Sequence, residues 1–441
     1  MLPPLKTIRA GLHRTTEAFA RELAHPGSVT PRWSDLEWRL ATAAAAAHGV
    51  SPLLYERSGW THPHWRRFLQ DQHEHVAIRH ARVRTLLEQI DTGARVTGLA
   101  MTPLKGAALH ALDIYAPGER PMADIDLLVH ENDVGAATSL LQEIGYVTSF
   151  DSWRHRVFKS ATGMPPSALG EHRDTPVNIE LHTRIRERLP VSVIDITDRI
   201  LRHEHAPGLN PYPSRSALLA HLLLHAAGNL CGHSLRLIHL HDIALLARSM
   251  QPEEWMFLWR GGACWWAVPP LQMVARYYPD AIPDVVLATL ARDCPLLLRA
   301  VSSHRSLANV SSSELWLHAF AGIEWSRTPL EVARFVAGRI RPSAEKIRER
   351  KDMARTQLWL RDRSWVTATQ SRRIFTWLTR KVPRMDTMYV VRMAFAEATS
   401  EVGIEEVPVR ESTDSFRHPA DLEPPAAASE SGRIGPRADL S

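Results

Sequence analysis

The chain has 441 residues, of which 44% are hydrophobic and 23% are charged, and its formal net charge is +5. This composition is ordinary for a soluble globular protein of two or three domains. The modest charge allows an anionic ligand but argues against a dedicated nucleic-acid binder. The N-terminus lacks the apolar core of a signal peptide, and the longest apolar runs are too short or too interrupted by histidine to span a bilayer. We therefore expect a cytoplasmic protein with no membrane partner.

The three cysteines carry no disulfide or zinc signal. Cys231, Cys264 and Cys294 are scattered, odd in number and without a CxxC pair. A disulfide framework and a zinc knuckle both need paired cysteines. The expected state is therefore three buried free thiols.

Residues 1–96 are expected to form a helical region. Ser34-Asp35-Leu36-Glu37 has the sequence of a capping box, in which the Ser hydroxyl and the Glu carboxylate reciprocally satisfy free backbone donors. An Ala-rich helix should follow it and stop at Gly49. A second helix is predicted from about His64 to Ile90, because apolar residues recur there at helical intervals, and it should end at the following Asp-Thr-Gly.

Residues 97–200 alternate between strand and helix patterns, which predicts an α+β unit. The predicted elements are a strand over 99–106 closed by a glycine turn, a helix over 107–117 ended by Pro117, a strand over 123–130, a helix over 131–145 closed by Gly145, and strands over 153–161 and 176–185. Residues 201–400 read as helical, clearly so after Pro213. Residues 405–441 are rich in Pro, Ala, Ser and charge, so this tail is predicted to be disordered.

Two aspartates stand out in the strand predicted over 123–130. Asp124 and Asp126 are two residues apart, so both side chains leave the same face of the strand. The opposite face is apolar and would anchor the strand in a core. Two carboxylates this close repel one another, and a divalent cation would neutralise them. Two solvent-facing acids on an edge strand would also explain the pair, so its interpretation depends on the motifs around it.

Those motifs supply further polar groups. Lys105 and Gly106 lie at a predicted strand-to-helix turn, where glycine lets backbone amides approach a phosphate and lysine adds a compact charge. The strand predicted over 176–185 alternates apolar residues with Asn178, Glu180 and His182. One face of that strand therefore offers a third carboxylate and an imidazole.

In this order and spacing, the segments PLKGAALHAL, ERPMADIDLLV and VNIELHTRI resemble the uncharacterised nucleotidyltransferases of the DNA polymerase beta superfamily, which often lie near peptide natural-product genes. The resemblance covers most of residues 30–355. It implies a polymerase-beta-like nucleotidyltransferase core, a small mixed sheet with helices, over residues 97–200. N- and C-terminal helical regions, residues 1–96 and 201–400, would flank this core.

The resemblance also implies a role for individual residues. The implied metal ligands and catalytic acids are Asp124, Asp126 and Glu180, and the implied nucleotide-binding residues are Lys105, Gly106, Arg120 and His182. Glu180 matches the acid that also acts as base for the acceptor hydroxyl. The wider superfamily commonly has Asp at that position, so Glu180 is one methylene longer.

The implied activity is the Mg²⁺-dependent transfer of a nucleoside monophosphate from a nucleoside triphosphate to an acceptor, with two metal ions in the site. We expect a small molecule or a peptide as acceptor rather than a nucleic acid, in a peptide natural-product pathway. Two alternatives stay open: a catalytically weak accessory protein that binds a nucleotide or a peptide, and a toxin-like enzyme that modifies tRNA or protein. The sequence specifies neither the acceptor, nor the preferred base, nor the oligomeric state.

Other polar clusters are weaker candidates. His221 and His225 lie four residues apart on a predicted helix, but the glutamate of an H-E-x-x-H motif is absent, which favours histidines on a partly buried helix. Asp242 lies at helical distance from Arg236, so a structural ion pair explains it at least as well as ligand binding. The basic stretches at 339–351 and 371–384 are typical of solvated helix faces, with a nucleic-acid or acidic-peptide surface as the alternative.

Overall fold

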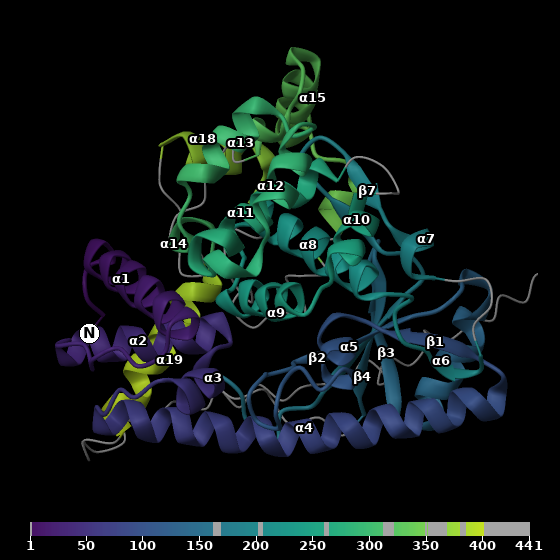
Figure 1. The fold of residues 1–441 in the computed structure, drawn as a ribbon, viewed down its shortest axis with the longest axis horizontal. Coiled ribbons are helices and arrows are strands. Elements are labelled where there is room, and N and C mark those ends of the chain that lie inside the picture. The colour runs from purple at the N-terminus through teal and green to yellow at the C-terminus, as the bar shows by residue number, and fades with distance from the viewer. Residues whose placement is uncertain are drawn as a thin grey trace, which may run out of the picture. The chain divides into compact units, whose positions relative to one another are not determined.

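The computed structural model begins with four helices (Figure 1). They are α1 (Leu5–Ala24), α2 (Asp35–His48), α3 (Ser51–Arg57) and α4 (Pro63–Thr97). The predicted capping box of α2 is confirmed, because the Ser34 hydroxyl accepts from the Glu37 amide and the Glu37 carboxylate accepts from the Ser34 amide at 2.9 Å. The helix ends as predicted at Gly49, whose φ of +66° is left-handed and favours glycine.

The structure describes residues 2–161, 169–201, 206–259, 264–311, 322–348, 351, 368–379 and 385–400. Met1–Glu401 forms one compact unit. The predicted disordered tail, residues 405–441, lies outside the described residues. No helix in the described ranges is both long enough and apolar enough to cross a membrane.

The predicted end of the second long helix is wrong. α4 is 35 residues long. It continues through Asp-Thr-Gly and ends at Gly98, whose φ is +72°. Gly93 lies inside the helix because it is a packing position: a Cβ there would overlap the side chain of Leu140. Asp91 binds Arg95 one turn further on at 2.8 Å and accepts from the backbone amide of Leu209 at 2.7 Å. The glycine therefore permits close packing and does not terminate the helix.

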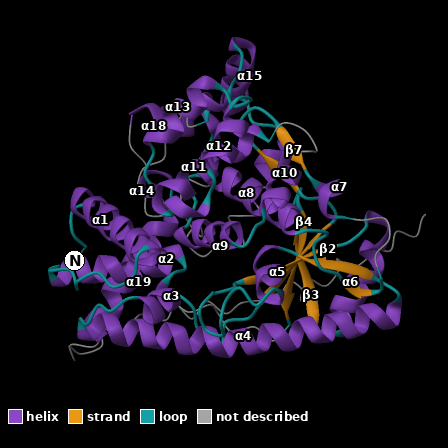
Figure 2. Ribbon diagram, viewed as in Figure 1, coloured by secondary structure: helices purple, strands orange, loops and turns teal. Residues whose placement is uncertain are grey.

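In the described residues, one mixed sheet has six strands in the order β3-β4-β5-β2-β1-β8. Their bounds are β1 (Ala100–Pro103), β2 (Asp124–Leu128), β3 (Tyr146–Asp151), β4 (His155–Ser160), β5 (Asn178–His182) and β8 (Gly208–Leu209). β2 runs parallel to β5 and β1 runs parallel to β8, while the other neighbouring strands are antiparallel. Figure 2 shows these strands gathered in one part of an otherwise helical structure. The predicted α+β class with a small mixed sheet is confirmed. The patterns did not predict β3, β8 or the hairpin of β6 (Arg186–Arg188) and β7 (Val193–Asp195).

The helix predicted over 107–117 is displaced. The observed α5 (Lys105–Ala111) begins at the Lys-Gly turn itself and ends well before Pro117. Asp113, with φ of +50°, reverses the chain after the helix. The reversal buries Tyr115, whose hydroxyl donates to Asp242 at 2.7 Å, and this long-range contact fixes the end of the helix. The helix predicted over 131–145 begins as a 3-10 turn, η1 (Glu131–Asp133), and continues as α6 (Val134–Glu143).

One face of the sheet is covered by α4 and α6. Four apolar residues of β2 and β5 lie in this core, and each of them is at most 2% exposed: Ile125, Leu127, Ile179 and Leu181. Leu128, at the end of β2, belongs instead to the core of the helical elements. The alternation of these four residues with polar residues is the pattern that predicted both strands, and it is confirmed. The polar residues therefore leave the opposite face, toward α8 and α9.

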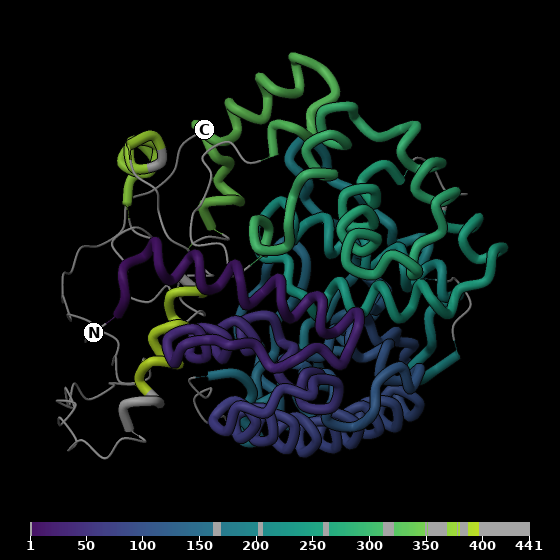
Figure 3. Tube along the Cα trace, turned by 60° about the vertical axis from the view of Figure 1, so that its left-hand side comes forward, coloured from purple at the N-terminus to yellow at the C-terminus, as the bar shows by residue number. Residues whose placement is uncertain are grey.

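Most later elements are helical, as predicted for residues 201–400. Their bounds are α7 (Thr197–Ile200), α8 (Arg215–Gly232), α9 (Leu237–Arg248), α10 (Pro252–Trp259), η2 (Trp265–Ala267), α11 (Val268–Tyr277), η3 (Pro279–Ala281), α12 (Asp284–Ala291), α13 (Leu296–His304), α14 (Leu307–Val310), η4 (Ile323–Trp325), α15 (Pro329–Ile340), α18 (Gln370–Thr379) and α19 (Met385–Ser400). Apart from α15 and α18, these helices share one large hydrophobic core with α1 to α3. α19 lies beside α2, so the end of the described chain packs on its beginning (Figure 3). None of the three cysteines forms a disulfide. Cys264 and Cys294 are buried as predicted, whereas Cys231 is half-buried.

Candidate active site

Three carboxylates lie together because two strands are parallel and in register. Asp126 of β2 pairs with Glu180 of β5, and Asp124 pairs with Asn178. Paired residues of neighbouring strands point to the same face of a sheet. The acids of the Asp-x-Asp motif and the acid of the Glu-Leu-His motif are thereby brought to one face, opposite the core.

This face forms one wall of a cavity of about 510 Å³. The other walls come from the Lys-Gly turn at the start of α5 and from α8 and α9. All seven residues to which the resemblance gives a role line the cavity. The charged and histidine residues that line it are Lys105, Arg120, Asp124, Asp126, Arg154, His155, Glu180, His182, His225, Arg236, His239 and Asp242.

The two aspartates differ in charge state. The side chain of Asp124 has no hydrogen-bond or ion-pair partner among the described residues, and burial together with the charges of Asp126 and Glu180 raises the pKa of Asp124 to about 7. Burial also opposes ionisation of Asp126, but the Lys105 ammonium and a hydrogen bond from His182 outweigh it and hold the pKa of Asp126 well below its usual range. The negative charge of Asp126 is therefore balanced by a cation in contact with it, whereas a negative charge on Asp124 is not.

Lys105 supplies the compensating charge. Its Nζ lies 2.7 Å from Oδ1 of Asp126. Burial alone would lower the pKa of Lys105, but the surrounding acids, Asp126 first, raise it, so the ammonium is charged. Lys105 has φ of +46°, in the left-handed region that costs about 1 kcal/mol for a residue with a Cβ. This conformation directs the side chain back over β2 from the first residue of α5.

Gly106 leaves space for a neighbouring side chain. A Cβ at position 106 would lie 2.5 Å from Nη1 of Arg120, so only glycine leaves room for the guanidinium against the turn. Arg120 in turn donates from Nε and Nη2 to the two carboxylate oxygens of Asp242, each at 2.8 Å. This bidentate pair is almost fully buried and holds Arg120 in the cavity wall. The ion pair predicted between Asp242 and Arg236 is wrong in its partner, which is Arg120, from a loop far away in the sequence.

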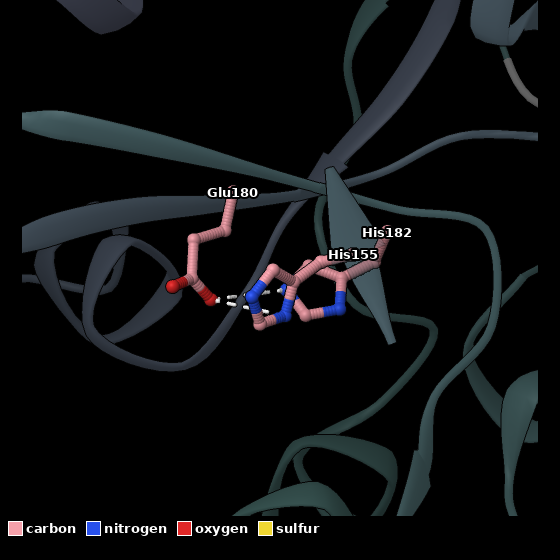
Figure 4. A group of neighbouring side chains, drawn as sticks. All are labelled: His155, Glu180 and His182. Carbon is pink, nitrogen blue, oxygen red and sulfur yellow. Dashed lines mark ion pairs between the residues drawn. The ribbon is translucent and has the colours of Figure 1, made fainter. Parts of the chain in front are cut away.

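His155, Glu180 and His182 form a second group of possible metal ligands (Figure 4). Oε2 of Glu180 lies 3.4 Å from Nδ1 of His155 and 3.7 Å from Nε2 of His182, and the three ligand atoms lie within 4.8 Å of one another. Burial lowers the pKa of His155 to about 4, so this imidazole is neutral and able to bind a metal ion. His182 differs: burial opposes its charge, but hydrogen bonds to Asp126 and Glu180 outweigh it and raise the pKa.

The sequence motifs missed His155. It lies on β4, opposite His182 in the antiparallel pairing of β4 with β5. The strand that contains it was predicted, but nothing in the sequence placed that strand next to β5. The motifs also gave no role in the site to Arg154, and they gave Arg236 only the role of a structural ion-pair partner, although both cations line the cavity. Arg154 is bound by Glu187 at 2.6 Å, whereas Arg236 is exposed, and its charge lowers the pKa of Asp124 slightly against the stronger effects of burial and the neighbouring acids.

His221 and His225 do not act as a ligand pair. The Tyr212 hydroxyl lies 2.7 Å from Nδ1 of His221 and 3.4 Å from the backbone amide of Lys105, which donates to it. Burial holds the pKa of both histidines well below the usual value. His221 thus supports the Lys-Gly turn through Tyr212, in agreement with the structural interpretation of this pair.

Three acids on adjacent strands of a small mixed sheet thus lie beside a basic strand-to-helix turn in one cavity. Carboxylate oxygens are the donors that hard divalent cations prefer. The chain belongs to a family described as uncharacterised nucleotidyltransferases, whose sequence model matches residues 34–280. This match covers more than half of the chain and includes all the cavity residues named above. No curated protein and no solved structure matches the chain.

Proposed function

We propose that the chain is a Mg²⁺-dependent nucleotidyltransferase with a polymerase-beta-like core. The observation that carries the proposal is Asp124, a half-buried carboxyl that shares one face of the sheet with Asp126 and Glu180 and has no ion-pair partner among the described residues. Such a group lowers stability unless a ligand neutralises it. The family membership supports a nucleoside triphosphate as the substrate that a cation would accompany.

The residues fit a divalent cation. Asp124, Asp126 and Glu180 offer carboxylate oxygens, the donors that Mg²⁺ prefers, on two rigid neighbouring strands. When bound there, divalent cations would neutralise charge on the triphosphate and lower the pKa of the attacking hydroxyl. The neutral imidazole of His155 beside Glu180 would also allow Mn²⁺, because imidazole suits transition metals better than it suits Mg²⁺.

The remaining steps use groups of the chain. The Lys105 ammonium would leave Asp126 and bind the triphosphate. Its strained position at the start of α5 places it beside Asp126 and in the lining of the cavity, so both partners are within its reach. The acceptor oxygen forms a bond to the α-phosphorus, the bond from that phosphorus to the bridging oxygen of pyrophosphate breaks, and the hydroxyl proton goes to Glu180. Arg120 is held by Asp242 and would fix the wall of the nucleotide site.

For the acceptor we propose a hydroxyl group on a small molecule or a peptide. The cavity of about 510 Å³ has the volume of a single small-molecule site, and the net charge of +5 is modest for a chain of this length. Both features favour a compact acceptor over a nucleic acid.

The test compares wild type with Asp124→Asn and with Asp113→Asn. Asp113 is exposed and outside the cavity, and its φ of +50° is one that asparagine tolerates, so the second variant is a matched control. Binding of each nucleoside triphosphate is measured by calorimetry in Mg²⁺ and in EDTA, and label transfer from α-³²P-labelled triphosphates is measured in cell extract.

We expect wild type and Asp113→Asn to bind a triphosphate only in Mg²⁺ and to transfer label, and Asp124→Asn to lose both activities. Binding that is equal in EDTA and unaffected by Asp124→Asn, with no transfer, would contradict the proposal and indicate an accessory binding protein.

A further inference from the structure

The lysine and arginine side chains of the active-site cavity differ in what they already bind. Within the described ranges, four of them line the cavity: Lys105, Arg120, Arg154 and Arg236. The first three pair with Asp126, Asp242 and Glu187, in that order, at 2.7, 2.8 and 2.6 Å. The side chain of Arg236 has neither an ion pair nor a hydrogen bond to any residue that the structure describes. One cation of the cavity is therefore uncommitted.

The acid that the sequence offers to Arg236 is occupied. Both carboxylate oxygens of Asp242 accept from Arg120, and one of them also accepts from the Tyr115 hydroxyl. Arg236 instead acts at longer range on Asp124. Burial and the neighbouring acids raise the pKa of Asp124, and the charge of Arg236 opposes them. The guanidinium thus lies within electrostatic reach of the acids without contacting any of them.

The backbone that carries Arg236 is fixed on both sides. The residues before and after it, Leu235 and Leu237, are fully buried. The Leu235 amide donates to the carbonyl oxygen of Val310 at 3.0 Å. The Leu237 amide donates to Nδ1 of His48 at 3.1 Å. The side chain of Arg236, in contrast, is exposed. A ligand that binds it therefore needs to order one side chain and no backbone, which keeps the entropic cost of binding low.

Exposure places Arg236 on the solvent side of the cavity. Asp126 is 5% exposed and Lys105 is half-buried, whereas Arg236 is exposed. In a nucleotidyl transfer the α-phosphorus reacts at the acids that bind the metal ions, and the β- and γ-phosphates extend away from them. These two phosphates carry most of the charge of the triphosphate. The planar fork of arginine matches phosphate oxygens and stays charged throughout the physiological pH range.

We propose that Arg236 binds the β- and γ-phosphates of the nucleoside triphosphate and stabilises the pyrophosphate that leaves. This inference rests on the proposed nucleotidyl transfer and assigns the residue that contacts the leaving group. When the bond from the α-phosphorus to the bridging oxygen breaks, its electron pair stays on that oxygen, so negative charge on the pyrophosphate increases. Arg236 stabilises this charge without first breaking an ion pair, whereas Lys105 must leave Asp126.

Calorimetry with inorganic pyrophosphate in Mg²⁺ tests the contact, because this probe has the two phosphates and no nucleobase. We expect Arg236→Gln to weaken pyrophosphate binding about tenfold or more, the equivalent of one charge-assisted contact. Arg236→Lys should recover part of the affinity, since it keeps the charge but not the fork. The side chain is exposed, so both variants should fold. Arg292→Gln removes an exposed arginine outside the cavity and should bind pyrophosphate as wild type does.

The same variants are titrated with each nucleoside triphosphate in Mg²⁺, and the affinity of Arg236→Gln should fall by a similar factor. Two outcomes would overturn the inference: pyrophosphate that does not bind wild type, and pyrophosphate that binds wild type and Arg236→Gln equally. The second outcome, with a loss of affinity for the triphosphate alone, would place Arg236 at the nucleoside. Transfer of label by wild type decides the proposed function separately. Weaker binding of pyrophosphate to Arg236→Gln without label transfer by wild type would support the phosphate contact and count against the transfer.

Discussion

Replacing Asp124 with asparagine should raise the thermal stability of the metal-free protein. The wild-type carboxyl is half-buried beside Asp126 and Glu180, and its pKa of about 7 shows that the fold disfavours its charge. Asparagine keeps the shape and removes the charge. Replacing this candidate catalytic residue would thus stabilise the fold. Such an effect is expected where a functional site keeps a charged side chain that lowers the stability of the protein.

The size of the effect follows from linkage. A carboxyl whose pKa is about 7 in the folded chain and 3.8 in the unfolded chain loses about 4 kcal/mol of folding free energy at pH 8. Because Asp124 lines an open cavity, solvent screening reduces this to roughly 2 kcal/mol. With an unfolding entropy of about 2 cal/mol/K per residue over the unit Met1–Glu401, the variant should melt about 2 to 5 °C higher.

The effect should depend on pH in a defined direction. The folded pKa of Asp124 is raised, so the stability linked to its proton is fully present below the unfolded value of 3.8 and is lost as pH rises toward 7. The difference in Tm between Asp124→Asn and wild type should at least double between pH 5 and pH 8, and Mg²⁺ should reduce it by stabilising wild type.

Differential scanning calorimetry in EDTA and in Mg²⁺ provides the assay, with Asp113→Asn as the control that should melt as wild type. A variant that melts at or below the wild-type temperature at pH 8 in EDTA would show that the carboxylate of Asp124 is stabilised, and it would refute the reasoning.

Two further changes test the Lys-Gly turn. Lys105→Ala should raise the KM for the triphosphate about tenfold or more, the equivalent of one charge-assisted contact, in initial rates at saturating Mg²⁺, and Lys105→Arg should restore it only partly. Unaltered kinetics in Lys105→Ala would reduce the turn to a scaffold. Gly106→Ala should destabilise the fold by about 1 to 3 kcal/mol in denaturant unfolding, because its Cβ would displace Arg120. Gly135→Ala, where no atom lies within 4 Å of the new Cβ, should be neutral or stabilising, and an equal loss in both variants would contradict the role of Arg120.

Local pattern was enough to predict the strands that carry the acids. In β2 and β5 each polar residue alternates with a residue that is buried in one core, so the period of two assigns every side chain to a face before any tertiary contact is known. The capping box of α2 is local in the same sense, since both of its partners lie within one turn.

Contacts between distant segments could not be predicted from local sequence patterns. Arg120 and Asp242 are separated by more than a hundred residues, and the nearer Arg236 was the plausible partner from sequence. His155 joins Glu180 only because β4 pairs with β5, an order of strands that no periodicity contains. The sequence predicts a helix stop at Gly93, whereas in the structure the absence of a Cβ there leaves room for the side chain of Leu140. In each case tertiary packing decided what local propensity left open.

The length of α4 sets the spacing of two separate cores. Leu69 packs in the core of the helical elements, and Val83 packs in the core beneath the sheet, both from a single uninterrupted helix. A rise of about 1.5 Å per residue separates them by about 21 Å along the axis, and their spacing brings both to nearly the same side of the helix. Inserting or deleting one residue between them would rotate one core relative to the other by about 100°. The middle of α4 should therefore accept changes of residue type at its exposed positions but no insertion or deletion. The length of α4 fixes the distance between the helical elements and the sheet that carries the acids.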